Sequence, residues 1–177
     1  MKKVMLLTIF AALMMISSAA VAQTTASGTL TVTATVTGSI NLVFNSDPSG
    51  VTLGSPGTNA ATLAFGNVSA FGTLASPNIV RSTTATNFTV SSAVDVLVTK
   101  TNSASANYTL KAQLGTADAV NTWTVGGVAV TNAAQSTLTA TGTYAANSNF
   151  PVAITVPFTT ASGTLISNTI NYVATAN

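Results

Sequence analysis

Apolar and polar residues alternate with a period of two along most of the chain after residue 28. In the clearest run, residues 29–37, threonine occupies every odd position and the even positions are apolar: Leu30, Val32, Ala34 and Val36. A period of two places alternate side chains on opposite faces of a β-strand, and β-branched residues favour its pleated surface. The run therefore predicts a strand with one apolar face.

The same alternation recurs in short segments that are separated by Gly, Pro, Asn and Ser. No segment after residue 22 shows the periodicity of an amphipathic helix. Successive strands with hairpin turns predict an all-β protein, a single antiparallel β-sandwich over residues 23–177. Besides 29–37, the expected strands are residues 40–44, 62–66, 79–84, 87–91, 93–101, 108–114, 122–125, 128–131, 136–144, 152–158 and 165–175.

Turn residues predict how several of these strands are joined. Gly126-Gly127 lies between two alternating runs and suits a two-residue hairpin turn with positive φ at both positions. Asp47-Pro48-Ser49-Gly50 is typical of a type I turn, and Ser55-Pro56-Gly57-Thr58 of a type II turn with Gly57 at positive φ. Pro151 and Pro157 cannot donate ladder hydrogen bonds, so the strand 152–158 is expected to lie at an edge or to begin and end there.

Two strand pairs are expected from sequence order. The closing pair is 152–158 with 165–175, joined by a turn of small residues at 159–163. Residues 93–101 are expected to pair with 108–114, which directs Asp95, Lys100 and Lys111 toward water. In the last strand, one face is formed by Ile166, Ile170, Tyr172 and Ala174.

The first 22 residues have the pattern of a cleaved signal peptide. Lys2 and Lys3 precede an apolar run at 4–16, and Ala20-Val21-Ala22 matches an A-x-A cleavage site. The run is shorter than the roughly 20 residues of a membrane-spanning helix. We therefore expect cleavage before Gln23 and an exported protein, located in the periplasm, on the cell surface or outside the cell, that is not embedded in a membrane.

Composition excludes several function classes. After cleavage the chain keeps three cations, Arg81, Lys100 and Lys111, and three anions, Asp47, Asp95 and Asp118. Scattered cations form no footprint for nucleic acid. The chain contains no Cys and no His, and its three carboxylates lie far apart in sequence. We therefore expect no catalytic residues, no metal, no cofactor and no enzymatic activity.

Two aromatic residues suggest an alternative. Trp123 and Tyr144 have side chains of the kind that stack on sugars. Their positions beside a hairpin and at a strand end are more typical of residues that pack in a core. A monomeric secreted sandwich that binds polysaccharide is therefore the alternative function.

The pattern resembles the immunoglobulin-like β-sandwich proteins of bacterial surface appendages, which include chaperone–usher pilins and the spore coat protein U group. Thr62-Leu63-Ala64-Phe65-Gly66 is similar to their L-x-F-G strand. Gly163 lies fourteen residues from the end and precedes an alternating last strand, as in pilins. The chain differs from them in lacking a disulfide.

This resemblance implies an immunoglobulin-like sandwich with a structural or adhesive role at a bacterial surface. It also implies assembly by strand exchange, with partners that are other copies of the chain or related surface subunits. The expected strand-exchange face is Leu30, Val32, Ala34 and Val36. In the polymer that face completes the next subunit's sandwich, whereas in a monomer the same strand pairs within its own domain.

Overall fold

The computed structural model describes residues 27–177. The expected signal peptide and the cleavage point before Gln23 lie outside the described residues. The chain divides into two units, Met1–Thr35 and Val36–Asn177. Of the first unit, residues 27–35 are described, and they are extended, unpaired and exposed.

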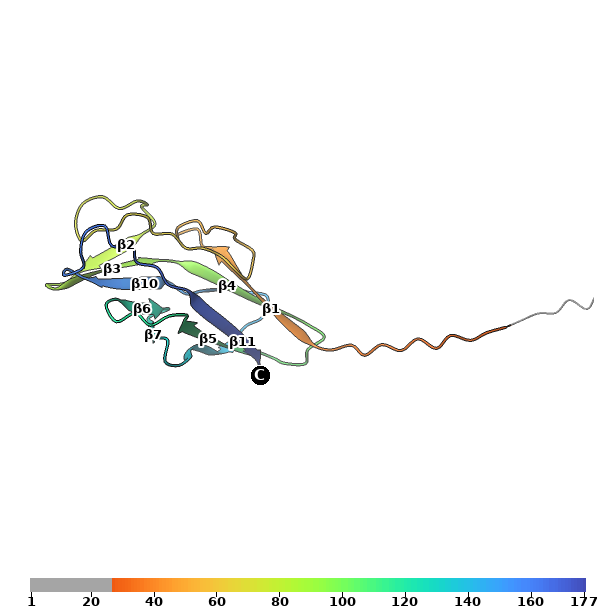
Figure 1. Ribbon diagram of the computed structural model, residues 1–177. Helices are drawn as coiled ribbons and strands as arrows, with labels where there is room; N and C mark the ends of the chain where they lie inside the picture. The colour runs from red at the N-terminus through yellow and green to blue at the C-terminus, as the bar shows by residue number, and fades with distance from the viewer. Residues whose placement is uncertain (1–26) are drawn as a thin grey trace, which may run out of the picture. The chain divides into compact units, whose positions relative to one another are not determined.

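The second unit is all-β (Figure 1), and residues 27–177 contain no helix that is long and apolar enough to cross a membrane. Each strand pairs antiparallel to its neighbours. The strands are β1 (Ser39–Ser46), β2 (Val80–Thr83), β3 (Asn87–Ser92), β4 (Val94–Thr101), β5 (Tyr108–Leu114), β6 (Thr122–Val125), β7 (Val128–Val130), β8 (Ser136–Gly142), β9 (Asn147–Asn149), β10 (Val152–Pro157) and β11 (Ile170–Ala176).

The strands form two layers, as in a β-sandwich. Hydrogen bonds connect them in the orders β1-β4-β9, β2-β3-β10-β6-β7 and β11-β5-β8. Only Ala93 separates β3 from β4, and the Phe150 amide donates to the Val94 carbonyl (2.8 Å), so the first two groups continue into each other. The group β11-β5-β8 forms the second layer.

Alternation within each strand builds the core between the layers. In β5 every second side chain is buried, and β3 and β10 show the same pattern. One cluster includes Val90, Trp123 and Ile154, and a second includes Val96 and Tyr108. The Tyr108 ring occupies the space that a side chain at residue 142 would need: a Cβ on Gly142 would lie 2.3 Å from that ring.

The local turn predictions are confirmed. Gly126 and Gly127 both have positive φ, 57° and 79°, between β6 and β7. The Gly50 amide donates to the Asp47 carbonyl (3.0 Å), which closes the predicted turn. The strand β10 lies between β3 and β6 and is bounded by Pro151 and Pro157, so its prolines mark where it begins and ends.

Both long-range pairings expected from sequence order are wrong. The strand β10 belongs to one layer and β11 to the other, and β4 and β5 are likewise in different layers. Asp95 consequently does not face water: it is only 7% exposed. Neighbouring segments cross between the layers because each layer must bury its apolar face against the other.

Several strand limits also differ from those expected. Residues 62–66 form no strand, since Thr62 has only an isolated bridge to Gly54 and Gly66 turns the chain at a φ of 64°. The last strand begins at Ile170 rather than at residue 165. The short strand β9 was not predicted, because its Asn-Ser-Asn sequence has no alternation of apolar and polar residues.

Candidate functional site: two open sheet edges

The strand β1 is an edge strand whose outer side is only partly covered. Phe44 directs its backbone away from β4: its amide donates to the Thr58 carbonyl (2.8 Å), and its carbonyl accepts from the Gly57 amide (2.7 Å). Backbone direction alternates along a strand, so Ile40 and Leu42 direct their N–H and C=O groups to the same side. No strand of residues 27–177 pairs with β1 on that side.

The strand β11 is the second open edge. The Asn177 amide donates to the Asn107 carbonyl (3.0 Å), and the Gly115 amide donates to the Thr169 carbonyl (2.7 Å). Odd-numbered residues here thus direct their backbone toward β5. The even-numbered ones direct theirs to the open edge. These residues are Ile170, Tyr172, Ala174 and Ala176.

The two open edges border the same part of the core. Phe44 of β1 and Tyr172 of β11 contact each other edge to face, with ring centroids 5.0 Å apart. Leu42, Phe44, Tyr172 and Ala174 pack against the second core cluster, and all four remain partly exposed. Burial raises the pKa of Tyr172. The site is therefore a strip of partly exposed core residues on two strands that each have an unpaired edge. Figure 1 labels these strands, β1 and β11.

The C-terminal residue ties β11 to its sheet. The Asn177 side chain donates to the Ala140 carbonyl (2.8 Å) and to Asn107 Oδ1 (2.6 Å), and it accepts from Thr109 Oγ1 (2.9 Å). These bonds hold the β5 side of β11 and leave its other side open.

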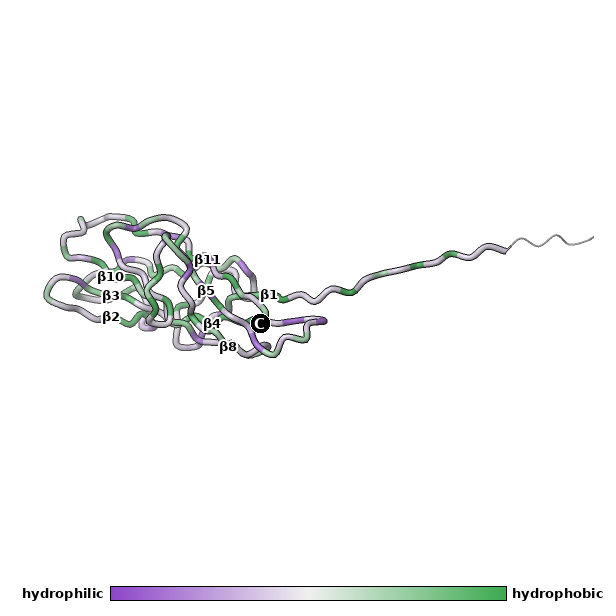
Figure 2. The backbone as a smooth tube through the Cα atoms, turned by 90° about the horizontal axis from the view of Figure 1, so that it is seen from below, coloured by the Kyte–Doolittle hydropathy of each residue, from purple (hydrophilic) through white to green (hydrophobic). Residues whose placement is uncertain are grey.

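The expected strand-exchange face lies in a segment without partners. Residues 27–38 form no strand, and no hydrogen bond among the described residues involves them. Leu30, Val32 and Val36 are 89%, 81% and 74% exposed. Figure 2, coloured by hydropathy, shows the alternation of apolar positions along this segment. The strand predicted at 29–37 is thus not formed among the residues that the structure describes.

Of the expected last-strand face, Ile170, Tyr172 and Ala174 lie on β11, whereas Ile166 lies in the segment before it. Ile166, Ile170 and Tyr172 pack against the first core cluster, and Ala174 packs against the second. Sequence reasoning missed Phe44 and Leu42 as the opposite border. The alternation of Ile40, Leu42 and Phe44 was a signal for it, but alternation does not identify the strand that lies opposite.

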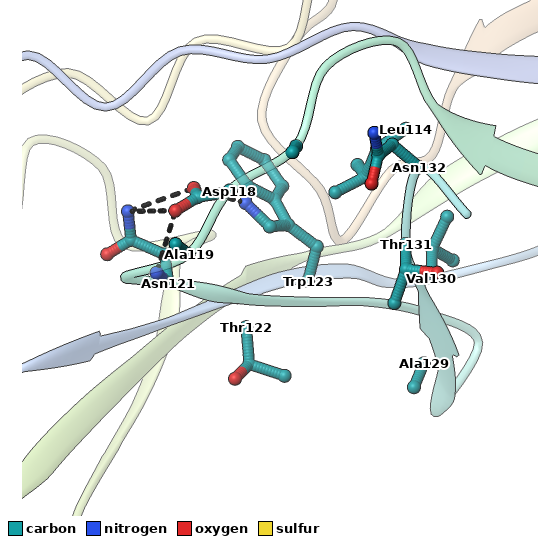
Figure 3. Close-up of a pocket in the computed structure, with 11 residues that line it drawn as sticks. Leu114, Asp118, Ala119, Asn121, Thr122, Trp123, Ala129, Val130, Thr131 and Asn132 are labelled. Carbon is teal, nitrogen blue, oxygen red and sulfur yellow. Dashed lines mark hydrogen bonds between the residues drawn. The ribbon is translucent and has the colours of Figure 1, made fainter.

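A separate polar site surrounds Trp123 (Figure 3). The pocket of about 350 Å³ beside it is lined by residues of the loop before β6 and of β7. Trp123 is only 6% exposed, and its indole Nε1 donates to Asp118 Oδ2 (2.8 Å). Trp123 is therefore a core residue, and its ring has no exposed face on which a sugar could stack.

Asp118 organises this loop. Its carboxylate accepts from the amides of Val120 (3.0 Å) and Asn121 (2.8 Å), and from the Asn121 side chain. Partial burial raises the pKa of Asp118, but the hydrogen bonds from the Asn121 backbone and from Trp123 outweigh it and lower the pKa to about 2. The carboxylate is thus a structural acceptor, a role that its loop position did not reveal.

The other two carboxylates meet at Asn149. Its Nδ2 donates to Asp47 Oδ2 (2.8 Å) and to Asp95 Oδ1 (3.2 Å). The hydroxyl and amide of Ser49 hold the pKa of Asp47 below its usual range. Residues 27–177 contain no group of three or more acidic, His or Cys side chains placed to hold a metal ion.

No family model, no curated protein and no solved structure matches the chain.

Proposed function

We propose that the chain is an exported, non-enzymatic structural or adhesive subunit of a bacterial surface, and that it assembles by strand exchange. One observation supports this proposal: β1 and β11 each leave an edge open beside the same part of the core, while the alternating residues 29–37 form no strand within residues 27–177. In this proposal the fold is an immunoglobulin-like sandwich that lacks one strand, and residues 29–37 of another copy supply it.

The physical argument rests on unmet hydrogen bonds and exposed apolar surface. An open strand edge is a template for another strand, which gains backbone hydrogen bonds and buries alternate side chains. Burial of Leu30, Val32 and Val36 and the new backbone hydrogen bonds would stabilise the paired state. The conformational entropy that the segment loses on ordering opposes this gain.

The conformation of Gly38 disfavours a tight hairpin that would pair residues 29–37 with β1 of the same chain. A fold-back onto β1 needs a tight turn at Thr37-Gly38, and such turns require positive φ. Gly38 does not have positive φ, and a Cβ on it would lie 2.7 Å from the Asn102 carbonyl oxygen. Gly38 therefore sits against the loop after β4, and the chain enters β1 without a turn.

The test uses the mature chain, residues 23–177, refolded over a range of concentrations. We expect oligomers that grow with concentration in light scattering and that persist in mild denaturant. Val32→Asp/Val36→Asp places charge on the apolar face and is expected to give folded monomers, because a buried unpaired charge is costly. The matched control, Thr31→Asp/Thr35→Asp, changes the opposite face and should assemble.

Two outcomes contradict the proposal. One is a parent chain that stays monomeric at every concentration. The other is equal assembly of the two double variants, which would show that the apolar face is not what is buried.

Export is tested separately from assembly. N-terminal sequencing of the protein recovered from outside the cytoplasm should begin at Gln23. A product that retains Met1 contradicts the proposed signal peptide.

A further inference from the structure

Residues 30–36 and the open edge of β11 offer the same number of positions for pairing. Four side chains of the segment lie on its apolar face, Leu30, Val32, Ala34 and Val36. On β11 the four even-numbered residues direct their backbone to the open edge. Only two arrangements pair all four positions, one antiparallel and one parallel.

The two arrangements differ in how side-chain sizes meet. The antiparallel one places Leu30 opposite Ala176, Val32 opposite Ala174, Ala34 opposite Tyr172 and Val36 opposite Ile170. Large side chains then meet small ones at three of the four positions. The parallel one places Val32 opposite Tyr172 and Ala34 opposite Ala174, which crowds one position and leaves another underfilled. Close packing disfavours both faults.

An aromatic ring of β1 restricts the space at the Tyr172 position. Phe44 reaches it from β1, with ring centroids 5.0 Å apart, and both residues are partly buried against the same clusters. A third large side chain at this level would have to displace one of the rings. The smallest apolar residue of the segment is Ala34, which suits this level.

We propose that the Phe44–Tyr172 pair sets the register of assembly: Ala34 of one copy lies opposite Tyr172 of the next, with residues 30–36 antiparallel to β11. This inference rests on the proposed strand exchange. It adds to that proposal the direction of residues 30–36 along β11, their register, and the pair of residues that selects this register.

Cysteine cross-linking tests the register directly, because the chain has no cysteine of its own. In the proposed register the outward residues pair as Thr35 with Asn171 and Thr31 with Thr175. These are non-hydrogen-bonded pairs, with Cα atoms about 4.5 Å apart, a separation that a disulfide spans. Asn171 and Thr175 are exposed, so the substitutions leave the core intact.

We expect Thr35→Cys/Asn171→Cys and Thr31→Cys/Thr175→Cys to form ladders of disulfide-linked chains on non-reducing gels. The matched controls exchange the partners: Thr35→Cys/Thr175→Cys and Thr31→Cys/Asn171→Cys should not. Cross-linking of the exchanged pairs instead would show a parallel strand, and would overturn the register while strand exchange stands.

Other outcomes separate the two proposals in the same way. A parent chain that assembles without cross-links at any of these pairs overturns the register alone. A disulfide within one monomeric chain would show that residues 30–36 pair with β11 of the same chain. That result would overturn both the register and the strand exchange.

The size argument has its own test. Ala34→Leu should lower the assembled fraction at least about tenfold through overpacking, whereas Val32→Leu, opposite Ala174, should change it less than about twofold. Equal effects of the two substitutions would show that the Phe44–Tyr172 pair does not select Ala34.

Discussion

The Phe44 ring on β1 meets the Tyr172 ring on β11 at a centroid distance of 5.0 Å and an interplanar angle of 71°. The two strands are not hydrogen-bonded to each other and belong to different layers. This contact therefore connects the layers along the side where both edges are open. Edge-to-face aromatic pairs contribute about 0.5–1.5 kcal/mol beyond the area they bury.

Phe44→Ala should accordingly lower the free energy of unfolding by about 2–4 kcal/mol, since it removes a partly buried ring together with its aromatic contact. Urea unfolding at a concentration where the chain is monomeric measures this. Phe71→Ala is the matched control, because Phe71 is 74% exposed, and it should change stability by less than about 0.5 kcal/mol. Equal losses in both variants would show that Phe44 does not connect the layers.

Gly142→Ala should destabilise the fold by about 1–3 kcal/mol, the usual cost of overpacking. The added Cβ would lie 2.3 Å from the ring of Tyr108, which is fully buried and has no room to move. Gly28→Ala is the control, since nothing lies within 4 Å of its Cβ position. Thermal unfolding of both variants checks this, and an unchanged melting temperature in Gly142→Ala would contradict the packing described.

Gly127→Val should cost about 1–3 kcal/mol, because β-branched residues strongly disfavour the φ of 79° found there. Gly127→Asn is the comparison, since asparagine tolerates this conformation and the Cβ position has nothing within 4 Å. Denaturant unfolding should rank the parent and the Asn variant close together, and the Val variant well below them. Similar stability of the two variants would mean that the hairpin turn relaxes.

Asp118→Ala should cost about 1–3 kcal/mol at neutral pH by leaving the Trp123 indole N–H without its acceptor. The pKa of Asp118 is lowered to about 2, below its ordinary value of about 3.9. The stability from the ionised carboxylate is therefore present above about pH 4 and lost as the pH falls toward 2.

The difference between parent and Asp118→Ala should shrink over that same range of pH. Asp118→Asn keeps an acceptor oxygen but does not titrate there, and so it separates the hydrogen bond from the charge. A difference between parent and Asp118→Ala that stays constant from pH 7 to pH 2 would contradict the described role of the carboxylate.

The local structure of this protein could be predicted from its amino-acid sequence. A period of two predicts where a strand can form from adjacent residues alone, and β3, β5 and β10 lie close to their predicted limits. Positive φ at Gly126 and Gly127 follows equally from local sterics, because glycine is the residue that adopts it freely. Both kinds of prediction depend on residues within a few positions of each other.

Strand partners were decided only by the tertiary structure. Asp95 is buried because β4 lies between β1 and β9 and not beside β5, a choice that depends on how both layers cover their apolar faces. For the same reason, residues 29–37 have the alternation of a strand and yet form none within residues 27–177. Alternation makes a segment able to pair, but whether a strand edge is left open, as on β1 and β11, depends on the packing of the whole fold.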